Sequence, residues 1–345
     1  MNLKLIKPKS LELGDTIGVV APSAGNAEIF PHRINMAKKM IEKLGYKVKF
    51  AKHSLKRNGY LSSNISERVE DIHDMFKDNL VKAIICTIGG NHSNQLLKYI
   101  DYKIINENPK IFIGYSDISV LHYAFMKKAN LLTFYGPCLM TQFGEYPEIL
   151  KYTLDYFNKA ITARESIGEI KQSETWTAEI LDWTKKMDLK RPRKQKKTND
   201  FIWLKKGEAK GKIIGGCVPS INHLIGTEYW IDSSDSIFFI DIPEGHDFGK
   251  GLSVSDLDAY LTDISNIGVF KKISGLIIGR PYNYSKEENE ILKKIILRIT
   301  YKYNYPIVLN ANIGHCDPII TLPYGVKASL NSNNNKFIIK ESGVL

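Results

Sequence analysis

The 345-residue chain lacks the segments that would attach it to a membrane or export it. It has no apolar run of about 18 residues, which a membrane-spanning helix needs. Its first residues, MNLKLIKPKSLELGD, have no apolar stretch of the length found in signal peptides. We therefore expect a soluble cytoplasmic protein without a membrane partner.

Cysteine is sparse and scattered. Cys86, Cys138, Cys217 and Cys316 lie far apart, so the chain has neither a CxxC pair nor a dense disulfide framework. We expect reduced thiols and neither a metal nor a cofactor.

The net charge of +11 is concentrated in one segment. Residues 185–197, KKMDLKRPRKQKK, hold eight Lys or Arg against the single Asp188, and removing their +7 leaves an ordinary +4 for the rest of the chain. No nucleic-acid-binding motif accompanies this basic segment. We favour a solvated loop over a basic site that attracts an anionic substrate. Nucleic acid is not expected as a partner.

Apolar runs alternate with amphipathic helical patterns through the first half, which predicts an α/β domain with a mostly parallel sheet and helices on both faces. Its strands are DTIGVVAPS, KVKFA, VKAIICTIGG and PKIFIGYSD. A polar stretch with two tryptophans follows, and the second half has further strands at SIFFIDIP, ISGLIIGRP and YPIVLNANIG. We predict an N-terminal domain over residues 1–160, a linking loop over 161–200 and a C-terminal domain over 201–345.

The motif FIGYSDIS, residues 112–119, places Ser116 between a strand and a helix. This setting can expose a nucleophile at the end of a sheet, but serine at the start of a helix is also a common N-cap. The hydrolase motif G-x-S-x-G is not met, because Ile118 stands where the second glycine would be. The local pattern alone favours the cap.

A serine nucleophile needs a base and an acid that orients it. His315, in a turn after a strand, is the most unusual candidate for the base, and His92 is an alternative. His122 lies on the predicted helix after Ser116, where we expect it to pack. Asp241 or Glu244, at the end of the FFIDIPEGHD run, could supply the acid. Gly89 and Gly90 could offer backbone N–H groups to an oxyanion; a phosphate cradle is disfavoured because no G-K-[ST] follows.

Several blocks together resemble the LD-carboxypeptidase family of serine peptidases, which includes the microcin C immunity proteases. They are GDTIGVVAPSAG, TIGGNHSNQLL, IFIGYSDISVLHYAF, YGP, GKIIGGCVPSINHLIGTEYW and IGHCDPIITLPYGVKASL. The resemblance implies an N-terminal flavodoxin-like α/β domain and a C-terminal β-rich α/β domain, with the active site at their interface. It also implies a homodimer.

Carried over by motif, the resemblance makes Ser116 the nucleophile and His315 the base, with an oxyanion hole formed by the amides of Gly90 and Asp117. The family's orienting Glu is replaced here by Asp241, which is one methylene shorter. We expect Asp241 to complete the triad, and Glu244 is the alternative acid and a candidate substrate contact.

Two residues bear on the substrate. Cys217 stands where the immunity branch commonly has a nucleotide-binding Asn, whereas Trp183 matches a loop tryptophan that stacks on the nucleobase; packing between the domains is its other interpretation. We expect an immunity-type protease that cleaves peptidyl- or aminoacyl-nucleotide carboxamide bonds. The alternatives are an LD-carboxypeptidase acting on murein tetrapeptide and a catalytically weak binding protein.

Overall fold

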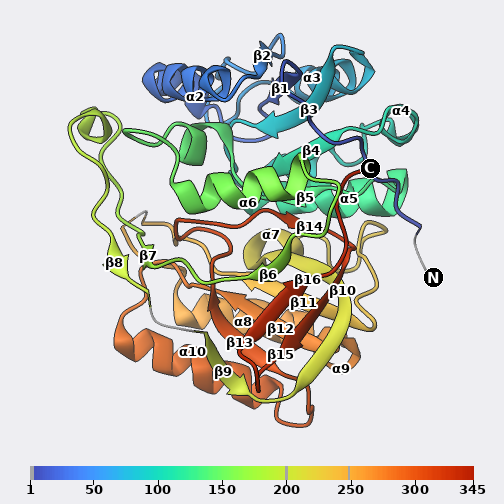
Figure 1. Cartoon of the computed structure of the whole chain (residues 1–345), viewed down its shortest axis with the longest axis vertical. Helices are drawn as coiled ribbons and strands as arrows, with labels where there is room; N and C mark the ends of the chain where they lie inside the picture. Colours follow the sequence, from blue (N-terminus) through green and yellow to red (C-terminus); the bar gives the residue numbers. More distant parts are fainter. Residues whose placement is uncertain (1–3, 199–200, 248) are drawn as a thin grey trace.

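The computed structural model describes residues 4–198, 201–247 and 249–345. The described strands form a six-stranded sheet, an eight-stranded sheet and a two-stranded hairpin. One continuous cluster of buried apolar side chains includes residues from both large sheets. Figure 1 shows the first half of the chain (blue to green) stacked on the second half (yellow to red). The predicted two-domain α/β architecture is confirmed.

The first sheet has the strand order β14-β5-β4-β3-β1-β2, and its five strands from β2 to β5 are parallel. The order 2-1-3-4-5 is that of flavodoxin-like folds. Its strands are β1 (Thr16–Val20), β2 (Lys47–Phe50), β3 (Val81–Cys86), β4 (Ile111–Gly114), β5 (Phe134–Tyr135) and β14 (Leu322–Pro323). Strands β3 and β4 are almost wholly buried, which explains why they read as continuous apolar runs.

Helices cover this sheet. They are α1 (Asn26–Ile29), α2 (Pro31–Lys43), α3 (Ile65–Lys77), α4 (Tyr102–Glu107), α5 (Ser119–Ala129) and α6 (Lys151–Ile161). Helix α3 begins at Asn64, whose side chain accepts the Glu67 N–H. Helix α5 is buried along most of its length and packs against α7 of the second half. The segment SNQLL after the Gly-rich turn is only a short 3₁₀ helix, Ser93–Leu96.

The second sheet has the order β6-β16-β15-β10-β11-β12-β13-β9, with a parallel centre from β10 to β13 and antiparallel edges. Its strands are β6 (Gly168–Ile170), β9 (Ile202–Lys205), β10 (Glu208–Cys217), β11 (Ser236–Asp241), β12 (Gly275–Gly279), β13 (Ile307–Ala311), β15 (Lys327–Asn331) and β16 (Lys336–Ile339). Its helices are α7 (Val218–Asn222), α8 (Val254–Asn266), α9 (Val269–Lys272) and α10 (Lys286–Ile299).

The two halves exchange short strands. β14, far along the chain, pairs with β5 in the first sheet, and β6, from the predicted linker, pairs with β16 in the second. The remaining linker forms the hairpin of β7 (Thr175–Trp176) and β8 (Lys196–Lys197), which runs along the left side of Figure 1 past both halves. No helix in the described part of the chain is long and apolar enough to cross a bilayer.

Candidate active site

Ser116 follows β4 in a conformation that serine rarely adopts. Its φ is +63°, in the left-handed region that costs energy for residues other than glycine. The Tyr135 hydroxyl accepts the Ser116 N–H at 3.1 Å, and the Ser119 hydroxyl donates to the Ser116 carbonyl at 2.7 Å. The short 3₁₀ helix Ser116–Ile118 is capped at Tyr115 without a side-chain hydrogen bond. The helix-cap interpretation of Ser116 is therefore wrong.

The Gly-rich turn after β3 passes directly beside Ser116. A Cβ on Gly89 would lie 2.9 Å from Ser116 Cβ, and one on Gly90 would lie 2.4 Å from Ser23 Oγ. The buried Asp117 side chain holds this turn, because its Oδ2 accepts the N–H groups of His92 at 3.0 Å and Ser93 at 2.9 Å. Gly89 thus lies against Ser116, and Asp117 fixes the turn that contains it.

His315 and Asp241 come together from the carboxyl ends of two strands of the second sheet. Asp241 ends β11 and is fully buried, and His315 Nδ1 lies 2.8 Å from its Oδ2 and 3.0 Å from its Oδ1. Gly314 makes this approach possible, because a Cβ there would lie 1.8 Å from Asp241 Oδ1. The shorter acid therefore reaches the imidazole.

Tyr135 links Ser116 to this pair. Besides accepting the Ser116 N–H, its hydroxyl donates a hydrogen bond to Asp241 Oδ2. Burial and the nearby Asp241 raise the pKa of Tyr135 well above its usual value, so the phenol stays protonated as the donor. Sequence reasoning missed Tyr135, although it lies in the YGP block that carried part of the resemblance.

Within the described residues, Ser116 Oγ makes no hydrogen bond to His315, although the ring of the adjacent Tyr115 lies edge-on to the imidazole at 5.0 Å. Such bonds often tighten only when a substrate is bound. The other histidines have different surroundings. His122 is buried with Nε2 2.9 Å from the Gly114 carbonyl, and burial lowers its pKa to about 3. The His92 ring lies against Tyr60.

Glu244 lies on the opposite side of the imidazole from Asp241. Its Oε2 is 3.6 Å from His315 Nε2, and its side chain is 28% exposed. Burial lowers the pKa of His315, but Asp241, Glu244 and Asp317 raise it by more, to about 9. Glu244 therefore does not orient the base through Nδ1; it faces the nitrogen that would exchange a proton with Ser116.

Cys217 is buried at the end of β10, close to the same pair. Its Sγ, a carboxylate oxygen of Asp241 and a ring nitrogen of His315 lie within 4.8 Å of one another, which is the arrangement a metal could use. Asp241 is already bonded to His315 and Tyr135, and burial raises the pKa of the Cys217 thiol well above its usual value. The set fits a hydrogen-bonded Asp–His pair better than a metal centre.

Trp183 packs against the first half of the molecule. The Arg33 guanidinium lies 4.3 Å from the centre of its ring, and Phe30 contacts it edge-on at 5.3 Å. Asp188, in the same loop, pairs with Arg33 at 3.1 Å. The loop is thereby attached to the start of α2, and one face of the indole is already occupied.

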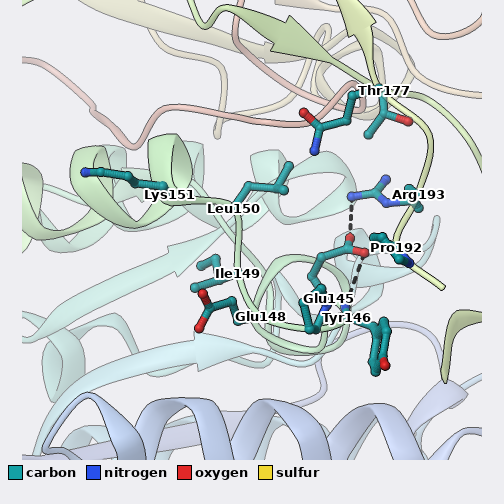
Figure 2. A pocket seen from close by; sticks show the side chains of 11 residues that line it. Glu145, Tyr146, Glu148, Ile149, Leu150, Lys151, Thr177, Pro192 and Arg193 are labelled. Atoms are coloured by element: carbon teal, nitrogen blue, oxygen red, sulfur yellow. Dashed lines mark hydrogen bonds and ion pairs between the residues drawn. The ribbon is translucent and has the colours of Figure 1, made fainter. Parts of the chain in front are cut away.

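The basic segment is only partly solvated. Its lysines are mainly exposed, but Arg193 is largely buried and pairs with Glu145 at 2.5 Å and with Asp317 at 2.6 Å. Figure 2 shows Arg193 reaching Glu145 at a cavity of about 210 Å³ that Thr177 and Pro192 also line. Because Asp317 is two residues from His315, Arg193 joins the loop, the first half and the histidine turn.

Comparison with known proteins decides the family. The model of the LD-carboxypeptidase N-terminal domain matches residues 17–136, and that of the C-terminal domain matches residues 210–330. The chain belongs to the LD-carboxypeptidase family. It is therefore a peptidase homologue, as the resemblance implied.

The relatives of this LD-carboxypeptidase family member include proteins with different named roles. The microcin C7 self-immunity protein MccF of Escherichia coli is 30% identical over 96% of this chain and 94% of its own. A probable murein peptide carboxypeptidase of Bacillus subtilis is 29% identical over 98% and 95%. The structure of an MccF-like protein from Bacillus anthracis superposes with a TM-score of 0.88 at 34% identity, covering 97% of this chain and 99% of that one.

Gly314→Ala tests the close approach of the histidine turn. The new Cβ would overlap Asp241, so we expect the free energy of unfolding to fall by about 3 kcal/mol or more. Gly268 also has a positive φ, +80°, but has open space around it. Gly268→Ala should therefore lose only about 1 kcal/mol from backbone strain. Urea denaturation measures both, and equal losses would contradict the packing argument.

Arg193→Gln tests the buried ion pairs of the loop. Removing the cation leaves the buried carboxylates of Glu145 and Asp317 unpaired, which should cost about 3–5 kcal/mol. Arg191, in the same segment, pairs with the more exposed Glu179, so Arg191→Gln should cost less than about 1 kcal/mol. If urea denaturation gave the two variants the same stability, Arg193 would not be the anchor.

Proposed function

We propose that the protein is a serine hydrolase that cleaves an amide bond through Ser116, His315 and Asp241. The observation that carries this proposal is the buried contact between His315 Nδ1 and Asp241 at 2.8 Å, with Ser116 connected to the same carboxylate through Tyr135. Asp241 takes the role of the orienting acid, and the positive φ of Ser116 matches the strained turn of nucleophilic serines.

In the proposed reaction, Ser116 Oγ attacks the carbonyl carbon and His315 Nε2 accepts its proton. The amides of Gly90 and Asp117 stabilise the oxyanion. When the tetrahedral intermediate collapses, the C–N bond breaks and His315 gives the proton to the leaving nitrogen. Water then attacks the acyl-enzyme with the same proton transfers and releases the acid. Asp241 holds the Nδ1–H throughout and stabilises the imidazolium.

The first candidate substrate is a peptidyl- or aminoacyl-nucleotide with a carboxamide bond. MccF structures contain aspartyl sulfamoyl adenosine and glutamyl sulfamoyl guanosine, and the MccF structure without ligand superposes on this chain with a TM-score of 0.89 at 28% identity. In this proposal Trp183 would stack a nucleobase on the ring face opposite Arg33. Cys217 offers the nucleotide no amide side chain, which is a difference from the immunity branch.

The second candidate is the bond before the terminal D-residue of murein tetrapeptide. It is favoured by the murein peptide carboxypeptidase of Bacillus subtilis, which matches nearly the whole chain. A catalytically weak binding protein is the alternative of another class. The contact of Asp241 with His315 argues against it, because the shorter acid reaches the base. We further propose a homodimer in the cytoplasm, on the family resemblance.

Ser116→Ala tests the enzyme claim. Incubation with murein tetrapeptide and with a peptidyl-adenylate, followed by chromatography, should show that the wild-type protein cleaves one of them. The variant should lose at least about 1,000-fold in kcat, because it lacks the nucleophile. An unchanged melting temperature would show that the fold is intact. Tight binding of both compounds without turnover by the wild type would support the binding protein instead.

Glu244→Gln tests the electrostatics of the base. Only the neutral imidazole accepts a proton, so wild-type kcat/KM should rise with pH until it passes the His315 pKa of about 9. Because the charge of Glu244 favours the imidazolium, its removal should lower the His315 pKa. The rise of kcat/KM with pH should then occur at lower pH. Asp247→Gln, at an exposed acid in the same loop, is the control and should leave the pH dependence of kcat/KM unchanged. If Glu244→Gln left the pH dependence of kcat/KM unchanged, this result would contradict the electrostatic role of Glu244.

A further inference from the structure

Arg280 occupies a central position in the second sheet that the proposed triad leaves unused. It directly follows β12, which lies between β11, the strand of Asp241, and β13, the strand that leads to His315. Its backbone N–H donates to the Ala311 carbonyl at 3.1 Å. The carboxyl ends of parallel strands in such sheets are where ligands bind. Arg280 therefore emerges at the same sheet edge as the catalytic pair.

The guanidinium of Arg280 is buried, and no acid among the described residues pairs with it. The residue is only 6% exposed, and its Nε and Nη2 have no hydrogen-bond partner among the described residues. Buried charges are normally paired, because leaving water is costly. Arg33 and Arg193 pair with carboxylates. The buried Arg68 also has no ion pair among the described residues, but its guanidinium donates to the Pro22 carbonyl and to Gln95 Oε1. The unpaired donors of Arg280 are what an incoming anion would satisfy.

A second cation lies near Arg280 through Trp176. The Arg280 guanidinium is 4.7 Å and Lys196 Nζ 4.8 Å from the centre of the Trp176 ring. Lys196 also lines a cavity of about 410 Å³, together with Ala178 and Tyr282. Ala178 and Tyr282 pack in one cluster with Cys316, the neighbour of His315, and with Trp176. The cavity thus adjoins both the tryptophan and the histidine turn.

The acid that lines this cavity is already neutralised. Both carboxylate oxygens of Glu179 accept hydrogen bonds from Arg191, at 2.7 and 2.9 Å. Lys194 and Lys196 line the same cavity. Its electrostatic character is therefore positive.

We propose that Arg280, with Lys196, binds an anionic oxygen group of the substrate, a carboxylate or a phosphoryl group, beside the catalytic histidine. This inference rests on the proposed hydrolase function and specifies its substrates as acidic. The planar fork of arginine suits either group, because it can donate two parallel hydrogen bonds. Lys196 adds a mobile second charge at the cavity wall. A neutral amide of the same shape binds less tightly.

The test measures binding without turnover. In the Ser116→Ala background, calorimetry compares AMP with adenosine and murein tetrapeptide with its C-terminal amide. In one of the two pairs, we expect the anionic compound to bind more tightly than its neutral counterpart. A preference for AMP identifies the bound group as phosphoryl, and a preference for the free tetrapeptide identifies it as carboxylate. Adding Arg280→Gln should reduce that preference about 10-fold or more, because a charge-assisted bond is lost. Adding Lys196→Gln should reduce it less.

Lys197→Gln is the matched control. Lys197 is the exposed neighbour of Lys196 on β8, and its substitution should leave the preference unchanged. Lys196→Gln, at an exposed position, keeps the proposal testable if Arg280→Gln lowers the melting temperature. The proposal is overturned if neither anion is preferred, or if the preference survives both substitutions. Failure of the Ser116 protein to hydrolyse either substrate would contradict the hydrolase function alone.

Discussion

The contact between Asp241 and His315 is the interaction on which the proposed active site depends. A carboxylate that is fully buried needs partners, and here both oxygens lie within 3.0 Å of the imidazole Nδ1 while Tyr135 donates to one of them. Gly314 gives the histidine turn room to approach. The acid is one methylene shorter than the Glu that the resemblance implies, and the local backbone brings His315 to it.

Other polar contacts connect the turn of Ser116 to the half of the molecule that carries this pair. Ser119 Oγ accepts the Cys217 N–H at 3.0 Å while donating to the Ser116 carbonyl, so one side chain connects the turn of Ser116 to the end of β10. Arg193 makes a second connection, from the linking loop to both halves. The serine and the histidine belong to different sheets, and these polar contacts set their separation.

Much of this arrangement could be predicted from the sequence. The buried strands have continuous apolar runs, and α2 and α3 have clear helical spacing, so the two α/β units followed directly. The candidate base and acid could be named from the sequence, but only the family resemblance favoured Ser116 as a nucleophile, because nothing near FIGYSDIS distinguishes a nucleophile from a cap. The role of Tyr135 could not be predicted in this way. A tyrosine in a two-residue strand has no distinctive sequence pattern, and its hydroxyl bonds residues of both halves only in the folded molecule.

The basic segment shows the same limit. Its composition indicated a solvated loop, which describes the exposed lysines, but Arg193 pairs with acids that are distant in the sequence. Arg280 also follows an ordinary buried strand, and its unpaired charge becomes visible only in three dimensions. Pairing of buried charges depends on tertiary contacts, which composition does not encode.

The turnover of Asp241→Glu tests most directly whether this site is built around the shorter acid. Because the His315 turn already contacts the Asp241 carboxylate, an added methylene has no free space and should displace the imidazole. We predict a fall in kcat of about 100-fold on whichever amide the wild-type protein cleaves, as expected for a misplacement of about 1 Å. Turnover by Asp241→Glu equal to or faster than that of the wild type would contradict the account.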